Sequence, residues 1–329
     1  MTPTNSELLA LAGKPLLVAV GIHDFLSREL PPREEILSPW LTTQSLSMIY
    51  AWRGVGKTHA ALGIAYAVAS GGKFLERWEA KRACEVLYVD GEMSAAALQE
   101  RLSAIVASSP KEPATGMLRI VTPDLQSGAM PDLATPEGQS ELNAVIGTAE
   151  LIILDNLSCL ARRGGRENDA ESWLSVAEWV LTLRQQGKSV LFIHHAAKGG
   201  QQRGTSKRED FLDTVICLKR PPDYQPRDGA VFEVHYDKAR GLAGDAVEPF
   251  EAKLTTDQHG AQSWATRSLT ESTLDRVAEL ANEGLTKSEI ATELEINKSN
   301  VTRAWRKAEE LGLIVIKGGR KPKRNDSDD

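Results

Sequence analysis

The octapeptide Ala-Trp-Arg-Gly-Val-Gly-Lys-Thr at residues 51–58 constrains this 329-residue chain more than any other feature. The apolar run 45–50 predicts a strand directly before it, and the Ala-rich run 58–70 predicts a helix directly after it. A glycine-rich loop between a strand and a helix surrounds phosphate oxygens with backbone N–H groups at the helix N-terminus. The sequence therefore predicts a phosphate-binding loop, with Ala51 where the usual pattern has glycine.

The residue types in this loop predict how it would bind a nucleoside triphosphate. Lys57 would reach the β- and γ-phosphates, and the Thr58 hydroxyl would bind Mg²⁺. We therefore expect ATP and Mg²⁺ as ligands. The expected nucleotide-binding residues of the loop are Arg53, Gly54, Val55, Gly56, Lys57, Thr58 and His59.

Short apolar runs alternate with helical patterns over the first 260 residues. Further strands are predicted at 85–89, 117–121, 151–154, 189–193, 213–219 and 231–236. Further helices are predicted at 95–107, 140–147 and 173–186. Buried strands that alternate with helices form parallel sheets with both faces covered. We expect a mostly parallel α/β sheet flanked by helices, with ligands at the carboxyl ends of its strands.

Two of the predicted strands deliver carboxylates to that edge. Asp155 ends the run 151–154, which is the Walker B arrangement, and would act on Mg²⁺ together with Thr58. Asp90 and Glu92 both follow the run 85–89, and either can position the attacking water. We choose Glu92 for this role, with Asp90 as the competitor.

A third strand, 189–193, ends in His194 and His195. Adjacent residues of an extended chain point in opposite directions, so this pair would chelate zinc poorly. We expect one of the two histidines to sense the γ-phosphate by hydrogen bonding. The alternative is a histidine with a purely structural role in the core.

Two basic segments suggest partners beyond the nucleotide. The loop 198–208, with Arg203 and Lys207, suits a nucleic-acid backbone, although a solvated surface loop has the same composition. Lys238 and Arg240 are two residues apart after the strand 231–236. They would point the same way and could reach the phosphates of a neighbouring subunit, as an arginine finger does. An exposed charged turn is the alternative.

Taken together, these motifs resemble those of the RecA-like ATPases, and most closely those of the plasmid RepA replicative helicases, which are relatives of DnaB. The resemblance covers residues 30–255 and is carried by AWRGVGKT, YVDGEM, LIILDN, LFIHHAAKG with RGTS behind it, and DKARG. It implies a hexameric ring, single-stranded DNA at 201–207, and action of Lys238 on a neighbour's ATP. The catalytic residues that it implies are Lys57, Glu92, Asp155, His195 and Arg240.

Beyond residue 265 the pattern changes to three helical segments, at 269–284, 287–294 and 299–312, and a short strand at 313–317. Their order resembles a winged helix-turn-helix, which the RepA helicases do not carry. Residues 298–307 hold four basic side chains and no acidic one, which suits duplex DNA. A small interaction or oligomerisation domain is the alternative. The expected DNA contacts are Ser299, Asn300, Arg303 and Arg306.

The composition limits the remaining choices. A net charge of −6 excludes a uniformly basic nucleic-acid coat, so any DNA contact must come from local patches. The three cysteines are far apart without a CxxC pair, which favours a reducing cytoplasm over a disulfide framework or a zinc site. No apolar run is long enough to cross a membrane, and we expect no membrane partner.

We therefore expect four regions: an N-terminal extension (1–39), a RecA-like ATPase domain (40–260), a winged helix-turn-helix domain (268–317) and a disordered tail (318–329). Three functions remain open. The favoured one is a ring-forming helicase or translocase of a mobile element. The others are an ATP-gated regulator of replication or transcription and a recombination-type ATPase. Glu92 with Lys238 and Arg240 favours turnover at a subunit interface, and so the motor.

Overall fold

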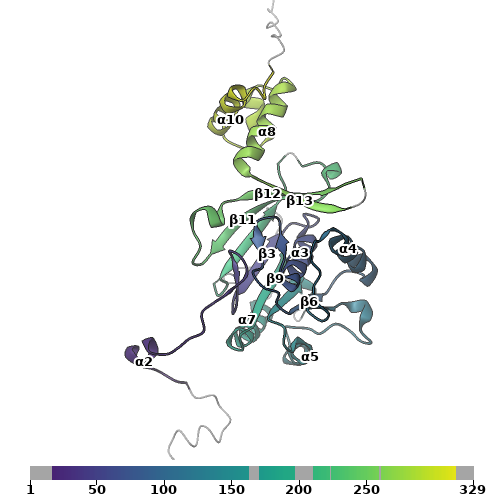
Figure 1. The fold of residues 1–329 in the computed structure, drawn as a ribbon, viewed down its shortest axis with the longest axis vertical. Coiled ribbons are helices and arrows are strands. Elements are labelled where there is room, and N and C mark those ends of the chain that lie inside the picture. Colours follow the sequence, from purple (N-terminus) through teal and green to yellow (C-terminus); the bar gives the residue numbers. More distant parts are fainter. Residues whose placement is uncertain (1–16, 163–169, 197–209, 223, 259–260, 316–329) are drawn as a thin grey trace, which may run out of the picture. The chain divides into compact units, whose positions relative to one another are not determined.

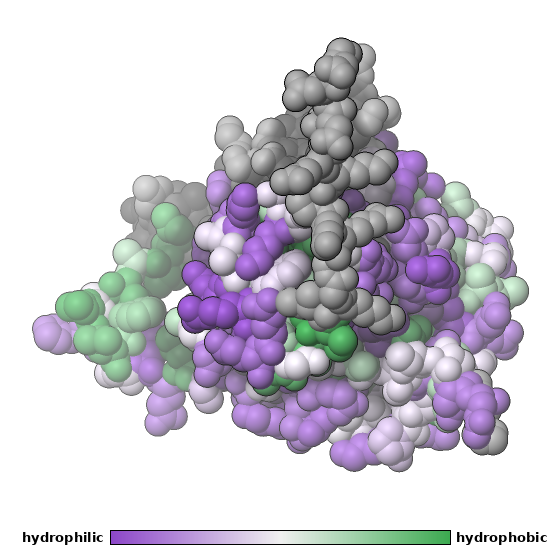
Figure 2. Space-filling model, turned by 90° about the horizontal axis from the view of Figure 1, so that it is seen from above, coloured by the Kyte–Doolittle hydropathy of each residue, from purple (hydrophilic) through white to green (hydrophobic). Residues whose placement is uncertain are grey.

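The computed structural model describes residues 17–162, 170–196, 210–222, 224–258 and 261–315. The chain divides into two compact units, the first ending at Arg33 and the second beginning at Glu34. The described part of the first unit holds the short helix α2 (Ile22–Leu26), whose apolar side chains are exposed. Figure 2 shows this segment as a largely green, apolar surface.

The second unit is built on a sheet that has nine strands in the described residues (Figure 1). Their order is β13-β12-β11-β10-β3-β9-β8-β6-β7. From β10 to β7 all neighbours are parallel, whereas β10 to β13 pair antiparallel. The predicted, mostly parallel sheet is confirmed. The strands are β3 (Leu46–Ala51), β6 (Val86–Asp90), β7 (Leu118–Val121), β8 (Leu151–Asp155), β9 (Ser189–His195), β10 (Thr214–Lys219), β11 (Val231–Ala239), β12 (Phe250–Thr256) and β13 (Gln262–Ser268).

Helices cover both faces of this sheet. Ile153 of β8 belongs to a buried cluster with α3 and α4, whereas its neighbour Ile152 belongs to a second cluster with α5 and α7. Because adjacent strand residues point to opposite faces, the two clusters lie on opposite sides of the sheet. The helices are α3 (Lys57–Ser70), α4 (Ala95–Ser108), α5 (Pro136–Ile146), α6 (Leu157–Leu160) and α7 (Ala170–Gln185).

Several elements differ from the sequence-based expectation. Strands β12 and β13 were not expected, and β13 now occupies the stretch before residue 269. β13 alternates between half-buried and exposed residues and is mostly polar, so it lacks the apolar run that identifies a buried strand. Other short elements not expected are β1 (Glu35–Leu37), β2 (Leu41–Thr42), β4 (Lys73–Phe74), β5 (Trp78–Glu79), η1 (Pro123–Leu125), η3 (Pro226–Asp228) and η4 (Gly244–Val247).

Three helices follow the sheet, as predicted: α8 (Leu269–Asn282), α9 (Lys287–Glu293) and α10 (Lys298–Glu310). A capping box of Thr286 and Glu289 is present at the start of α9. The helices share buried apolar residues, Val277 of α8, Ile290 of α9 and Val301 of α10. The predicted strand 313–317 is not found, because 313–315 has no regular structure and the rest lies outside the described residues.

Within the described ranges, none of the helices combines the length and the apolar character needed to cross a bilayer.

Candidate nucleotide-binding site

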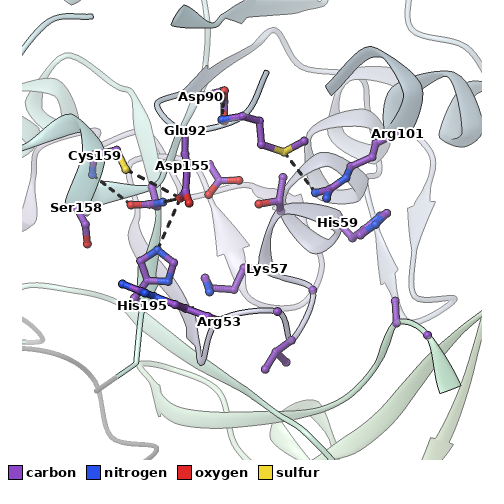
Figure 3. Close-up of a pocket in the computed structure, with 18 of the residues that line it drawn as sticks. Arg53, Lys57, His59, Asp90, Glu92, Arg101, Asp155, Ser158, Cys159 and His195 are labelled. Atoms are coloured by element: carbon purple, nitrogen blue, oxygen red, sulfur yellow. Dashed lines mark hydrogen bonds and ion pairs between the residues drawn. The ribbon is translucent and has the colours of Figure 1, made fainter. Parts of the chain in front are cut away.

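A cavity of about 870 Å³ opens where strands β3, β6, β8 and β9 end at their carboxyl side. All the loop residues expected to bind nucleotide line it, from Arg53 to His59. Asp90 and Glu92 after β6, Asp155 of β8 and His195 of β9 line it as well. Figure 3 shows Glu92 and Asp155 next to Lys57, with His195 and Arg53 on one side and His59 and Arg101 on the other. The fold thus brings together residues more than 140 positions apart.

The loop adopts a conformation that only glycine accepts readily. Gly54 and Gly56 have φ values of 75° and 120°, and Gly56 is the N-cap of α3. A Cβ at Gly56 would also lie 3.4 Å from the Phe232 ring. These two glycines turn the chain so that α3 begins at the cavity, where its N–H groups favour an anion.

Lys57 lies beneath this loop and is almost fully buried. Its Nζ donates to the carbonyl oxygens of Ala51 and Trp52 at 3.1 and 3.2 Å. Burial lowers the Lys57 pKa to about 8, against the opposing pull of Asp155 and Glu92. The lysine is therefore held in the cavity, and its ammonium group loses its proton at a lower pH than an exposed lysine does.

Asp155 is 4 % exposed at the end of β8. The Tyr88 hydroxyl donates to its Oδ2 at 2.6 Å. Burial raises the Asp155 pKa, while Tyr88, Thr58 and Lys57 counteract it. Thr58 and Asp155, predicted as the metal-binding pair, thus line the same cavity.

The two candidate water-positioning carboxylates have different surroundings. Asp90 is buried, and its Oδ2 accepts from the Met93 N–H at 3.0 Å and from the Thr122 hydroxyl at 3.4 Å. Burial, with Asp155 on the neighbouring strand, raises the Asp90 pKa to about 6. The Glu92 side chain is 59 % exposed to the cavity and accepts a hydrogen bond from Asn156 Nδ2. Its Oε2 lies 3.8 Å from His195 Nε2.

The remaining predicted residues lie elsewhere. Lys238 and Arg240 both donate to the carbonyl oxygen of Asp210, at 3.2 and 2.6 Å, and neither lines the cavity. Arg203 and Lys207 fall outside the described residues. Four further predicted residues are exposed on α10, and these are Ser299, Asn300, Arg303 and Arg306.

Other residues of the site were not predicted from the sequence. Tyr88 reaches Asp155 only because β6 pairs with β8, so no local pattern reveals it. Asn156 caps α6, and an Asn before an apolar segment was a usable signal. Arg101 lines the cavity from α4, where its NH1 donates to the Met93 sulfur at 3.3 Å. Arg220 donates to the Gly54 carbonyl at 3.1 Å.

The residues present fit Mg²⁺ with a nucleotide. Mg²⁺ prefers oxygen ligands and is usually held by one or two protein groups together with substrate phosphates. The Thr58 hydroxyl and the Asp155 carboxylate supply this donor set beside the loop. Arg53, Lys57 and the start of α3 supply the positive field for the phosphates.

The fold and this cavity define a P-loop ATPase of the RecA-like class. The structure is similar to that of the KaiC-like protein PH0186 from the hyperthermophilic archaeon Pyrococcus horikoshii OT3, with a TM-score of 0.50 and 14 % identity. That similarity covers 70 % of this chain and 94 % of the other. A family model described as "AAA domain" matches residues 14–201, and the chain belongs to this family. The expected RecA-like ATPase fold is thereby confirmed.

Proposed function

We propose that this protein is an Mg-ATP-dependent, DNA-acting ATPase, and specifically a ring-forming, RepA-like helicase or translocase of a mobile element. The observation that carries the proposal is the placement of Glu92 in the same cavity as Lys57 and Asp155. A site that only senses ATP needs no such carboxylate in its cavity, whereas hydrolysis needs a carboxylate to orient the attacking water.

In this proposal the reaction is phosphoryl transfer from ATP to water. Glu92, exposed to the cavity, orients the water and accepts its proton. Lys57 stabilises the charge that develops on the phosphoryl oxygens. Thr58 and Asp155 would hold Mg²⁺, which would supply positive charge to neutralise the phosphates. In this proposal His195, whose Nε2 lies 3.8 Å from Glu92 Oε2, responds to the presence of the γ-phosphate.

Assembly into a ring is supported by where the basic pair lies. Lys238 and Arg240, at the end of β11, both donate to the carbonyl oxygen of Asp210, so they form one basic pair. They do not line the cavity of their own chain. A neighbouring subunit's cavity is the partner that would give them a catalytic role.

The test of the proposed function is the ATP hydrolysis rate with and without single-stranded DNA, at one fixed salt concentration. We expect hydrolysis that the single strand stimulates strongly, followed by strand displacement on a forked substrate. Stimulation without displacement would favour a translocase or a recombination-type ATPase. Slow hydrolysis that ignores single strands would contradict the motor.

A second candidate function is an ATP-gated regulator that binds duplex DNA. The observation favouring it is the pair α9 and α10, which a turn of residues 294–297 joins, with Arg303 and Arg306 exposed. Replacing both arginines by alanine should weaken duplex binding and reduce the slope of log K against log[salt]. Unchanged binding would favour an interaction domain instead.

A further inference from the structure

Asn156 occupies a position that fixes the direction of its side-chain amide. It is buried directly after Asp155, and it is the N-cap of α6. Its Oδ1 accepts from the Cys159 N–H at 3.2 Å. An amide side chain has one oxygen acceptor and one NH₂ donor group. Because the oxygen is used by the helix cap, the NH₂ group must face the opposite way.

That NH₂ group donates to Oε2 of Glu92. The other groups that face the same oxygen are farther away, His195 Nε2 at 3.8 Å and Cys159 Sγ at 4.0 Å. A nitrogen at 3.8 Å lies beyond the range of a direct hydrogen bond. The charges of Lys57 and Asp155 act on the carboxylate through space. Asn156 therefore makes the shortest of these contacts with the Glu92 carboxylate, and Cys159 Sγ adds a longer hydrogen bond to the same oxygen.

An exposed glutamate needs such a restraint to act on water. The Glu92 side chain is 59 % exposed, and a glutamate has several rotatable bonds whose freedom must be lost before its carboxylate holds one position. A displacement of about 1 Å can cost a catalytic group about 100-fold in rate. The restraint comes from a residue whose own position is set by the last residue of β8 and the first turn of α6.

We propose that Asn156 is a positioning residue for ATP hydrolysis, and that it acts by holding the Glu92 carboxylate through its side-chain NH₂ group. This inference rests on the proposed function, because it requires that Glu92 orients the attacking water. Asn156 lines the same cavity, and in this proposal it acts through Glu92 and not on a reacting atom. It links the helix cap of α6 to the catalytic carboxylate, so the two move together.

The first test replaces the NH₂ group while keeping the cap. Asp caps helices as well as Asn does, so Asn156→Asp retains α6 but places an acceptor of negative charge against Glu92. Asn156→Ser also caps a helix, but its hydroxyl is too short to reach as the amide does. We expect kcat to fall about 10- to 100-fold in both variants, with the Kd for ATP changed less than about twofold.

Thr135→Ala is the matched control. Thr135 caps α5 through the Gly138 N–H, as Asn156 caps α6, but it does not line the cavity. This variant should lower Tm and leave kcat and the ATP Kd unchanged. If the Asn156 variants lose kcat while their Tm is unchanged, the loss of kcat cannot be attributed to a lost helix cap.

A double-mutant cycle tests whether the effect passes through Glu92. In a Glu92→Gln background the carboxylate is absent, so adding Asn156→Ser should reduce the residual rate by less than about twofold. A further loss as large as in the wild-type background would show that Asn156 acts elsewhere, and would overturn the proposal. So would wild-type kcat in both Asn156 variants. Failure of the proposed ATPase activity is a separate result, since the wild-type protein would then hydrolyse no ATP.

Discussion

At the scale of single residues, the depressed pKa of Lys57 predicts how nucleotide binding depends on pH. Burial lowers this pKa to about 8 in the free protein. Bound phosphates favour the charged lysine, so binding takes up protons above this pH. Affinity for ATP should therefore fall as pH rises from about 8 toward 9.5, by at most about tenfold per unit. Calorimetric titration in two buffers of different ionisation enthalpy measures the proton uptake directly.

Lys57→Arg is the control for this prediction, because a guanidinium stays charged throughout that range. Its affinity should be lower than that of the wild type at pH 7.5 but flat with pH. A wild-type affinity that is equally flat between pH 8 and 9.5 would contradict the predicted role of the lysine charge.

Arg101 offers a second residue-scale prediction. It lines the cavity beside His59, on the side opposite His195 and Glu92 (Figure 3). If Glu92 marks the γ-phosphate end, Arg101 would lie toward the base of the nucleotide, where a guanidinium can stack on an aromatic ring. Arg101→Ala should weaken ATP binding by about 1 kcal/mol. It should hardly change the binding of inorganic triphosphate; equal losses for both ligands would place Arg101 at the phosphates instead.

At the scale of elements, the sequence predicted what local pattern and chain order determine. The loop 51–58 and Asp155 were predicted because each follows a buried strand, and parallel strands end at one edge. The contacts Tyr88–Asp155 and Asn156–Glu92 were not predicted, because they depend on which strands and loops become neighbours. Strand β13 was missed because its polar, half-exposed residues give no apolar run. Which strands and loops become neighbours determined these features more than the intrinsic conformational preferences of the residues did.

The junction between the sheet and α8 rests on a buried ionic network, which makes an element-scale prediction. Glu251 of β12 is 3 % exposed and is paired with Arg276 of α8. It also accepts from Arg267 at 2.7 Å and from the Ser272 hydroxyl at 2.9 Å. Glu251→Ala removes this partner of the buried Arg276, whose contact with Glu233 is longer, at 3.7 Å. We expect a loss of about 3–5 kcal/mol in the free energy of unfolding, measured with urea.

The surface pair of Arg82 and Glu150 is the control for this network. Both side chains are well exposed and lie 2.7 Å apart. Arg82→Ala should therefore cost no more than about 1 kcal/mol. A Glu251 variant as stable as this control would mean that the network does not hold α8 on the sheet.

At the scale of the whole molecule, the residues that match the family model and the residues on which the proposed assembly and DNA binding depend lie in different parts of the chain. The match to residues 14–201 includes the loop, Glu92, Asp155 and His195. Lys238, Arg240 and helices α8–α10 lie beyond it. Nucleotide chemistry thus belongs to the part shared with the family. The proposed assembly and duplex DNA binding depend on the remaining part, so they need experiments on the full chain.

The decisive experiment on assembly mixes two inactive variants. Arg240→Ala should bind ATP but hydrolyse it at least about 1,000-fold more slowly, the usual effect of losing an arginine finger. Glu92→Gln should also be inactive, because its own cavity lacks the carboxylate. In a mixed assembly, an intact cavity of the first variant meets an intact Arg240 of the second, so hydrolysis should return. A Glu92→Gln/Arg240→Ala double variant added in place of Glu92→Gln supplies no intact Arg240 and should restore nothing. If Arg240 acted within its own chain, no mixing ratio would restore activity, and the ring proposal would lose its main structural support.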